Sequence, residues 1–365
     1  PVFALNESAS HDPTMHSALF PYDIVPVHPP KKGKPWELAN PWVNWNKKWH
    51  RKILKDVDAV YCRFPSCYWD GWHIYKLAIA QGKLGFASFH GDWEGVYRHL
   101  AEKAPMPKSL AYSCLASAAD RALAGVAGSS RVVFYVGTDL KRKYGEKSRE
   151  SVVFANYLHK ESDIYHREDT CLESPIRIIY VGSLSLRKGV RHLINVVGRL
   201  RSKGIMVVLS VVGEGAEKAE LTALAEKLDI AEHIEWHGYV PFGRALFDRY
   251  RESDLFVLPS LVGEGMPKVV VEAMSQSVPV VATDTGSTGS IIRDSRGGLL
   301  VSPGDEQGLY DSLMQLIENS ELRKDMIRNG VTFASRMTND SQRAIVSAAF
   351  HQHLSQIMSD DLRRE

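Results

Sequence analysis

The stretch Pro259-Ser-Leu-Val-Gly-Glu-Gly-Met-Pro-Lys-Val-Val-Val-Glu-Ala-Met274 decides how this chain is interpreted. The apolar run 255–258 predicts a buried strand, and a loop containing two glycines leads from it into a helix predicted from Pro267. Proline suits a first helical turn because its missing N–H would have no partner within the helix. The main-chain amides of Lys268 and Val269 would then face outward at the positive end of the helix dipole, which predicts a diphosphate site.

Two glutamates accompany this turn. Glu264 precedes the predicted helix and Glu272 lies within it. A carboxylate repels phosphate, but it accepts strong hydrogen bonds from the hydroxyls of a sugar or a ribose. We therefore expect both side chains to bind hydroxyls, in preference to being an ordinary surface residue and a solvated helix residue.

A second informative stretch is Tyr180-Val-Gly-Ser-Leu-Ser-Leu-Arg-Lys-Gly-Val190. A predicted strand runs into a loop of small residues, and Arg187 and Lys188 stand just before a predicted helix. The helix dipole disfavours cations at that end, so their presence there favours a bound anion. Two adjacent cations at a strand end are suited to neutralising a diphosphate leaving group.

Around these motifs, short apolar runs alternate with helical stretches, which is typical of parallel β–α–β units. The length of 365 residues favours two domains. The predicted strands are 2–5, 24–27, 59–62, 85–89, 132–136 and 152–155 in the first half, and 177–181, 206–212, 234–237, 255–258, 278–282 and 298–301 in the second. The predicted helices of the second half are 190–203, 218–228, 243–251, 267–275 and 306–319.

The domain boundary is placed in a polar stretch, 159–175, which we interpret as a linker. This gives domains 1–172 and 173–337, followed by a helical tail, 338–365.

The composition limits the classes of protein to which this chain can belong. Lys and Arg number 45 against 43 acidic residues, so no global excess of positive charge indicates a nucleic-acid partner. The four cysteines form no C-x-x-C pair and no metal-ligand spacing with histidine, which favours reduced thiols and a cytoplasmic protein. No apolar run is long enough for a membrane-spanning helix, and the first residues do not have the pattern of a signal peptide.

The stretch 36–55 is rich in Trp and Lys. Trp42, Trp45 and Trp49 fall on one helical face beside several basic residues. Such a helix can rest on an anionic membrane, which would suit a lipid-linked acceptor and a peripheral position at the inner face of the membrane. Packing of the tryptophans on a sheet is the interpretation that we favour, because an apolar stripe is the usual sign of core packing.

Over residues 176–336 the chain resembles the retaining glycosyltransferases of the GT-B fold, in particular family 4 (glycosyl transferases group 1). The resemblance implies two Rossmann-like domains with an interdomain cleft and a C-terminal helix that crosses back to the first domain. It implies that Glu264 contacts the donor sugar, that Glu272 binds the ribose hydroxyls, and that Arg187 and Lys188 hold the donor diphosphate.

Further contacts are implied by the same resemblance. His90, in Phe89-His-Gly-Asp-Trp93, is similar to a family histidine near the donor sugar, and Gly238 and Tyr239 belong to a segment that lies against the nucleobase. The other implied donor-binding residues are Ser183, Gly265, Met266, Pro267, Lys268 and Val269.

The chain also departs from the family pattern. Family members often carry arginine at the position of Ser183, and the usual glycine pair followed by glutamate reads here Thr285-Gly-Ser-Thr-Gly-Ser290. First domains of the family open with a strand and a glycine-rich loop. That loop is not evident, so we expect the chain to begin partway through the domain, without its first strand, unless 2–5 is that strand with an unusual loop.

The implied activity is metal-independent, cofactor-free, retaining transfer of a hexose-type sugar from a UDP- or GDP-linked donor. The acceptor would be a glycan, a lipid-linked molecule or a small molecule. No Asp-x-Asp motif suits a metal-bridged diphosphate. The alternatives are a non-catalytic or truncated sugar-nucleotide-binding protein of the same fold, and a nucleotide-sugar epimerase or phosphorylase. The epimerase would need an activating carboxylate or a histidine cluster, and the phosphorylase would need a cofactor lysine.

Overall fold

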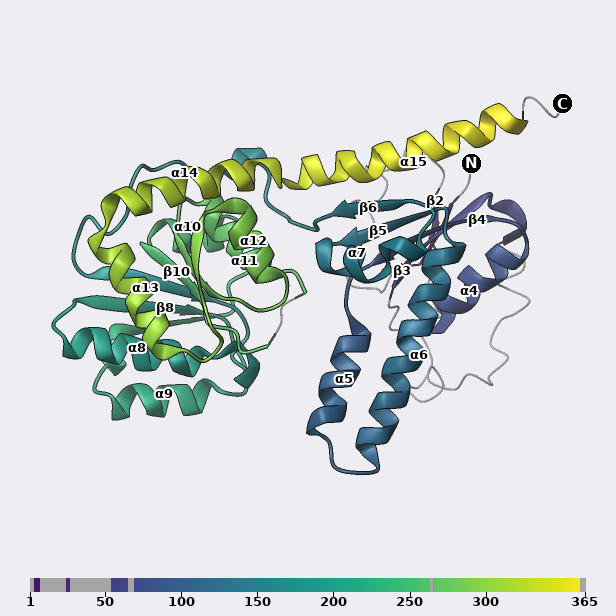
Figure 1. The fold of residues 1–365 in the computed structure, drawn as a ribbon. Helices are drawn as coiled ribbons and strands as arrows, with labels where there is room; N and C mark the ends of the chain where they lie inside the picture. The colour runs from purple at the N-terminus through teal and green to yellow at the C-terminus, as the bar shows by residue number, and fades with distance from the viewer. Residues whose placement is uncertain (1–2, 7–23, 27–53, 65–68, 263–264, 362–365) are drawn as a thin grey trace. The chain divides into compact units, whose positions relative to one another are not determined.

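The computed structural model describes residues 3–6, 24–26, 54–64, 69–262 and 265–361. The chain divides into two compact units, Pro1–Ala155 with Gln342–Glu365, and Asn156–Ser341. Each unit contains a six-stranded, all-parallel sheet accompanied by helices (Figure 1), which confirms the predicted α/β class with two Rossmann-like domains.

The first unit has the strand order β2–β1–β3–β4–β5–β6. Its strands are β1 (Phe3–Asn6), β2 (Ile24–Pro26), β3 (Ala59–Phe64), β4 (Leu84–Phe89), β5 (Val132–Val136) and β6 (Ser151–Phe154), all close to their predicted bounds. Its helices are α4 (Trp69–Ala80), α5 (Trp93–Lys103), α6 (Lys108–Ser129) and α7 (Thr138–Tyr144). Every residue of β5 is buried, as expected for an interior parallel strand that is covered on both faces.

The C-terminal helix, α15 (Asn339–Asp361), contributes to the core of the first unit. The ring of Phe350 stacks on Phe134 with a centroid separation of 4.9 Å and lies 4.7 Å from that of Phe86. Aromatic contacts of this kind add to the burial of apolar area. The predicted return of the C-terminal helix to the first domain is therefore confirmed.

The second unit has the strand order β12–β11–β10–β7–β8–β9. Its strands are β7 (Ile176–Val181), β8 (Val207–Val212), β9 (Ile234–Gly238), β10 (Leu255–Leu258), β11 (Val280–Thr283) and β12 (Gly298–Val301). Its helices are α8 (Val190–Ser202), α9 (Lys218–Lys227), α10 (Arg244–Arg251), α11 (Lys268–Ser275), α12 (Ser287–Ser295), α13 (Glu306–Glu318) and α14 (Ser320–Arg336).

Two of these helices were not predicted. Helix α12 begins with Ser-Thr-Gly-Ser, residues of low helix propensity, and it forms because Ile291 and Ile292 are buried. Helix α14 follows α13 after the single residue Asn319, whose side-chain oxygen accepts the Leu322 amide at 3.0 Å and caps the new helix.

The predicted linker, 159–175, is wrong. This segment packs on the second unit: the Tyr165 amide donates to the Ser275 carbonyl at 2.8 Å. The Arg167 side chain donates to the carbonyls of Ser277 at 3.2 Å and Arg251 at 3.0 Å. The units therefore divide at Ala155, upstream of the predicted boundary at residue 172. The polar side chains that suggested a linker satisfy main-chain carbonyls at helix ends.

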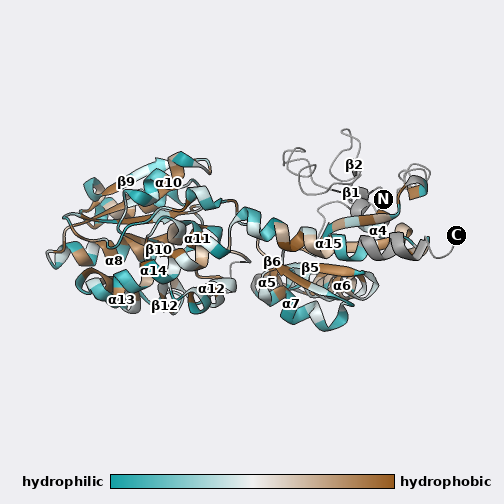
Figure 2. Ribbon diagram, turned by 90° about the horizontal axis from the view of Figure 1, so that it is seen from above, coloured by the Kyte–Doolittle hydropathy of each residue, from teal (hydrophilic) through white to brown (hydrophobic). Residues whose placement is uncertain are grey.

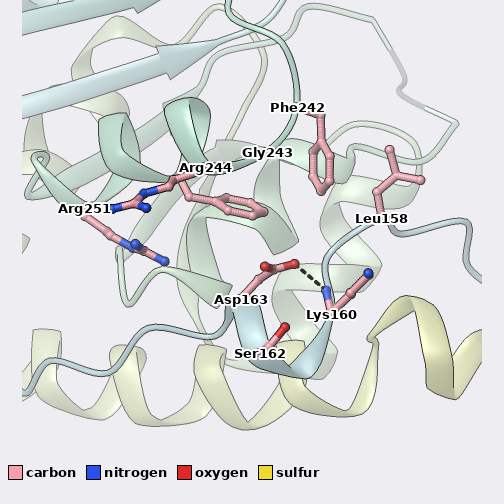
Figure 3. A pocket seen from close by; sticks show the side chains of 9 residues that line it. Leu158, Lys160, Ser162, Asp163, Phe242, Gly243, Arg244 and Arg251 are labelled. Carbon is pink, nitrogen blue, oxygen red and sulfur yellow. Dashed lines mark hydrogen bonds between the residues drawn. The ribbon is translucent and has the colours of Figure 1, made fainter.

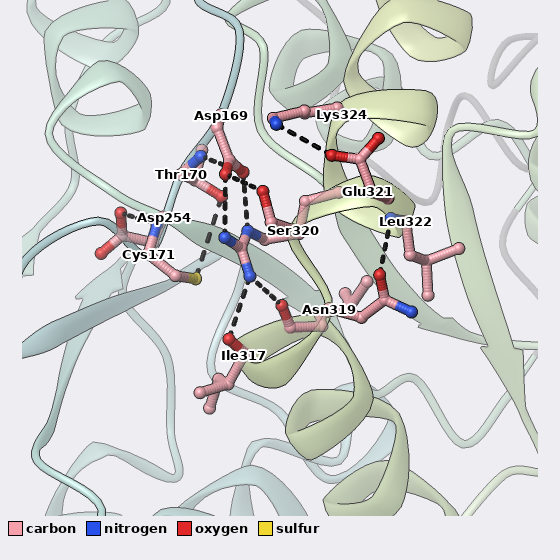
Figure 4. Close-up of polar contacts among 12 residues, drawn as sticks. Asp169, Thr170, Cys171, Asp254, Ile317, Asn319, Ser320, Glu321, Leu322 and Lys324 are labelled. Carbon is pink, nitrogen blue, oxygen red and sulfur yellow. Dashed lines mark hydrogen bonds and ion pairs between the residues drawn. The ribbon is translucent and has the colours of Figure 1, made fainter.

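The end of the same segment forms a buried ion pair (Figure 4). Arg323 Nε lies 2.7 Å from Asp169 Oδ1, and the two side chains are only 4% and 7% exposed. Arg323 also donates to the carbonyls of Leu316 and Ile317 at 2.7 and 2.9 Å. Burial acts to raise the pKa of Asp169, but the hydrogen bonds from Arg323 and Ser320 outweigh it and lower that pKa.

Breaking this pair is expected to destabilise the second unit. Arg323→Met leaves Asp169 buried without a cation, which costs about 3–5 kcal/mol in the free energy of unfolding. Lys324→Met is the control, because this neighbouring lysine is exposed and its surface pair with Glu321 contributes little to stability. Urea denaturation of both variants measures the difference, and equal losses would contradict the assignment.

Candidate functional site

The site is built where the order of the second sheet reverses. Chain order runs outward from β7 through β8 to β9, then returns to β10 on the other side of β7. Ligands of open parallel sheets bind at the carboxyl ends of strands at such a reversal. Both motifs predicted from the sequence lie there, since one follows β7 and the other follows β10.

The loops after β7 and β10 are joined by their main chains. The Leu261 amide donates to the Arg187 carbonyl at 2.8 Å. Gly189 has a φ of 65°, and a Cβ at this position would lie 2.2 Å from the Pro259 carbonyl oxygen. Only glycine allows this approach. The loop that carries Arg187 and Lys188 and the loop that follows β10 are therefore held in contact.

The two predicted cations differ in exposure. Both lie in a short 3₁₀ helix, Leu186–Lys188, that leads into α8. Lys188 is only 9% exposed, whereas Arg187 is exposed. A buried ammonium group acts in a medium of lower dielectric constant, where its attraction for an anion is stronger than in water. Lys188 is thus the better placed of the two to bind a phosphate group.

A third loop, after β8, lies against the loop that carries Ser183. A Cβ on Gly213 would lie 1.9 Å from the Gly182 oxygen, and one on Gly215 would lie 2.1 Å from the Leu184 oxygen. The Leu184 amide donates to the Glu214 carbonyl at 2.8 Å. The loop glycines therefore permit close main-chain packing, and Ser183 remains exposed beside them.

The start of α11 differs in detail from the prediction. Pro267 caps the helix with a ψ of 84° and is not its first residue, which is Lys268. The Lys268 amide donates to the Met266 carbonyl at 3.0 Å, so the prediction that it is a free donor is wrong. Among the described residues, no side chain caps α11 and its first turn holds no acidic residue, so none of them neutralises the positive end of its dipole. The role of the Val269 amide as a phosphate donor stays a prediction.

The loop before α11 is described only in part. Gly265 and Met266 lie within the described residues, and Gly265 is exposed. Glu264, predicted to contact the donor sugar, lies outside them.

Glu272 is buried in α11, with 5% of its surface exposed. The Tyr250 hydroxyl donates to Glu272 Oε2 at 3.2 Å. Burial raises the pKa of Glu272 to about 7, although the Tyr250 hydrogen bond and the charge of Lys268 oppose the shift. Tyr157 also has a raised pKa, through its own burial and then through the Glu272 charge. Glu272 is therefore not a solvated helix residue, and its carboxylate would gain from further hydroxyl donors.

The end of β9 carries Gly238 and Tyr239. The Gly238 carbonyl accepts the Gly213 amide at 2.7 Å, which ties β9 to the loop after β8. Tyr239 is 72% exposed, so its ring is accessible to a planar partner.

His90 belongs to the first unit, where it follows β4 as predicted. Its amide donates to the Phe64 carbonyl at 2.8 Å, and its Nε2 lies 3.0 Å from Ser88 Oγ. The ring meets that of Phe154 edge-on, with the centroids 5.9 Å apart. These contacts orient the imidazole at the carboxyl edge of the first sheet.

An ion cluster that the sequence did not reveal anchors the loop after His90. Lys143 Nζ lies 2.5 Å from both Asp92 Oδ1 and Glu94 Oε2, and Asp92 caps α5 by accepting the Gly95 amide at 3.2 Å. Burial would raise the pKa of Glu94, but Lys143 and Arg98 lower it. The capping pattern Asp-x-x-Gly was visible in the sequence, whereas the partner Lys143 was not.

The structure adds two further observations on the described residues. No cluster of three His, Cys, Asp or Glu side chains there is arranged to hold a metal ion. No helix there has the length and apolar character needed to cross a membrane. Most of the Trp/Lys-rich stretch, 36–53, lies outside the described residues.

The second unit is similar in sequence to known glycosyltransferases. Residues 162–332 match the family model described as "Glycosyl transferases group 1". An uncharacterised glycosyltransferase of Methanocaldococcus jannaschii is 32% identical over 163 residues, which are 44% of this chain and 43% of that protein. The phosphatidyl-myo-inositol mannosyltransferase of Mycobacterium leprae is 34% identical over 151 residues, 41% and 39% of the two chains. The matched part thus spans less than half the length of these relatives.

Among solved structures, the Anabaena protein HepE in complex with UDP has a TM-score of 0.64 at 15% identity. The similarity covers 98% of this chain and 99% of HepE. It shows that the chain has the GT-B fold.

Glycine 213 is expected to be needed for the close approach of its loop. Gly213→Ala places a methyl group against the Gly182 carbonyl, so the loss of unfolding free energy should exceed that of Gly204→Ala by about 2 kcal/mol or more. Gly204 is the matched control, because it also has a positive φ but no atom lies within 4 Å of its added Cβ. Urea denaturation compares the two, and equal losses would disprove the steric explanation.

The burial of Glu272 predicts a stability that depends on pH. Below the ordinary pKa of 4.5 the carboxyl is protonated in both the folded and the unfolded chain, so burial then imposes no charge penalty. Between there and about 7 the unfolded chain loses the proton first, so stability falls as pH rises.

Glu272→Gln removes this penalty. The variant should be more stable than the parent above pH 7 by up to about 3 kcal/mol, and the difference should vanish toward pH 4.5. Denaturation at several pH values checks this. An advantage for glutamine that stays constant over the range would show that Glu272 does not titrate as described.

Proposed function

Because its second unit carries a glycosyl transferases group 1 domain, we propose that this chain transfers a hexose-type sugar from a nucleotide-diphosphate donor, with retention of configuration. One observation carries the proposal. Buried Lys188, the uncapped start of α11 and buried Glu272 all belong to elements that meet at the reversal of one parallel sheet.

The donor diphosphate is assigned to the junction of the loops after β7 and β10. Lys188 supplies a buried positive charge, Arg187 an exposed one, and the Val269 amide a donor at the positive end of α11. These groups stabilise the negative charge that develops on the leaving diphosphate without a metal ion, because they are already oriented before the reaction. Ser183, Gly265, Met266 and Pro267 line the same junction in this proposal.

The nucleoside is assigned to the neighbouring groups. Glu272 accepts hydrogen bonds from the ribose hydroxyls, and the base lies against Gly238 and Tyr239. HepE, a protein of the same fold, has been solved in complex with UDP, which supports a nucleotide as the ligand class. Glu264 is assigned to the hydroxyls of the donor sugar, and His90 of the first unit to the reacting sugar.

The acceptor is proposed to be a glycan or a lipid-linked molecule. A relative named as a phosphatidyl-myo-inositol mannosyltransferase supports the lipid class. The cytoplasmic location and the membrane contact through 36–55 stay predictions of the sequence.

A panel of UDP, GDP and their sugars in a thermal-shift assay identifies the donor, because a ligand that binds only the folded state raises the melting temperature. The best donor is then supplied with a radiolabelled sugar. Transfer, or slow hydrolysis of the donor, supports the enzyme. A bound but intact donor supports a sugar-nucleotide-binding protein instead.

Two variants test the residues. Lys188→Ala should lower turnover by about a hundredfold or more, since it removes a charge that acts on the leaving group. Glu272→Ala should mainly weaken nucleotide binding. Lys203→Ala is the control, because this exposed lysine ends α8, the helix that Lys188 precedes. Full activity in both site variants would overturn the assignment.

A further inference from the structure

A pocket of about 390 Å³ in the second unit lies between α10 and the segment that follows Ala155 (Figure 3). One wall consists of Phe242, Gly243, Arg244, Phe247 and Arg251, and the other of residues of the stretch 158–163. None of these residues belongs to the proposed donor site. The pocket is therefore distinct from the proposed donor site.

The charged groups of the pocket are mainly cationic. Lys160, Arg244 and Arg251 contribute positive charge, and Asp163 is the acidic lining residue. Asp163 Oδ2 already accepts the Lys160 amide at 2.8 Å. Asp248, on α10 but outside the pocket lining, lies near both arginines. Its Oδ2 is 3.8 Å from Arg244 Nε, whose side chain is 92% exposed, and its Oδ1 accepts a hydrogen bond from Arg251 at 3.3 Å. Such partly exposed pairs are weak, so Asp248 offsets only part of the positive charge. Within the described residues, no acidic side chain pairs with the Lys160 ammonium.

Arg251 is held rigidly. Its Nε donates to Gln276 Oε1 at 2.8 Å, and its guanidinium lies over the Tyr165 ring at 5.1 Å. Gln276 Nε2 in turn donates to the Asp163 carbonyl at 2.8 Å, which links both walls of the pocket. An arginine that is oriented beforehand loses less side-chain entropy when it binds an anion.

The start of α10 reinforces the positive potential. Gly243 caps the helix without a side-chain acceptor, and no acidic residue lies in the first turn. The free amides and the helix dipole therefore favour an anion.

Part of the pocket is apolar. The rings of Phe242 and Phe247 meet edge-on, with centroids 5.2 Å apart. Figure 3 shows Leu158 near Phe242, with the Arg244 and Arg251 side chains on the other side of the view. A ligand with an apolar ring at one end and an anionic group at the other matches this arrangement.

We infer that this pocket is a second ligand site, which binds a phosphorylated small molecule with a planar apolar group. Arg244 and Arg251 lie seven positions apart on α10, on one helical face, and together with Lys160 they provide the donors for the phosphate. Phe242, Phe247 and Leu158 cover the apolar group. The inference is independent of the proposed transferase activity, because none of the residues that carry it belongs to the proposed donor site.

Phenyl phosphate is the probe, since it combines the two features, and benzyl alcohol is its uncharged counterpart. Saturation-transfer NMR on the full chain measures the dissociation constant of each. Phenyl phosphate should bind saturably, more tightly than benzyl alcohol and less tightly as salt is added. Lys160→Gln with Arg244→Gln should weaken it by about tenfold or more.

The matched control is Lys227→Gln with Arg249→Gln, which removes the same charges from α9 and from the part of α10 outside the pocket. The control should bind phenyl phosphate as the parent does. Lys188→Ala should also leave this binding unchanged, whereas it alters the proposed donor site.

Three results would overturn the inference. They are no saturable binding of phenyl phosphate, equal binding by the pocket variant and its control, and displacement of phenyl phosphate by UDP together with its loss in Lys188→Ala. The last result would assign the anion to the donor site. Retained phenyl phosphate binding in a chain that shows no sugar transfer would support the pocket and reject the proposed activity.

Discussion

The close main-chain contact between the loops after β7 and β10 is the constraint on which the rest of the site depends. The hydrogen bond from Leu261 to Arg187 and the absence of a side chain at Gly189 hold these loops within van der Waals distance. Residues about seventy positions apart in the chain thereby meet at one sheet edge. Rigid neighbouring strands position the loops, which is how a parallel sheet commonly supports a binding site.

A stability cost accompanies this arrangement. The desolvation of buried Glu272 outweighs the Tyr250 hydrogen bond and the charge of Lys268, so its pKa rises to about 7. Such a group persists in a fold when the surrounding structure overdetermines it, and it is a common feature of functional sites. In the proposed function, the hydroxyls of a bound ribose compensate part of this cost. The burial of Glu272 thus affects the stability of the fold, the dependence of that stability on pH and, in the proposed function, the binding of ribose.

The segment after Ala155 has more than a connecting role. Tyr165 and Arg167 satisfy main-chain groups at the ends of α10 and α11, while Asp169 forms the buried pair with Arg323. Through Gln276 and Arg251 the segment is also linked to the cationic pocket. Packing and ligand recognition are therefore supported by the same few polar contacts, which explains why the segment is rich in polar residues although it is well packed.

The sequence alone determined the strand pattern, because buried parallel strands are short apolar runs that end in turn residues. All twelve strands appear close to their predicted positions, and the two motifs follow the expected strands. The resemblance to the GT-B glycosyltransferases was likewise visible in residues 176–336.

The tertiary structure decided what depends on contacts between distant residues. It placed 159–175 on the second unit, because the carbonyls that its side chains bind come from helices about a hundred positions later. Helix α12 forms because its isoleucines are buried, although its first residues have low helix propensity. The Lys268 amide donates to the Met266 carbonyl in a local turn and is not available to a ligand. The tertiary structure also buried Lys188 while leaving Arg187 exposed, although the two are adjacent in sequence. Periodicity reports which residues are apolar, whereas burial of a charge and pairing of a donor depend on which atoms the fold brings near.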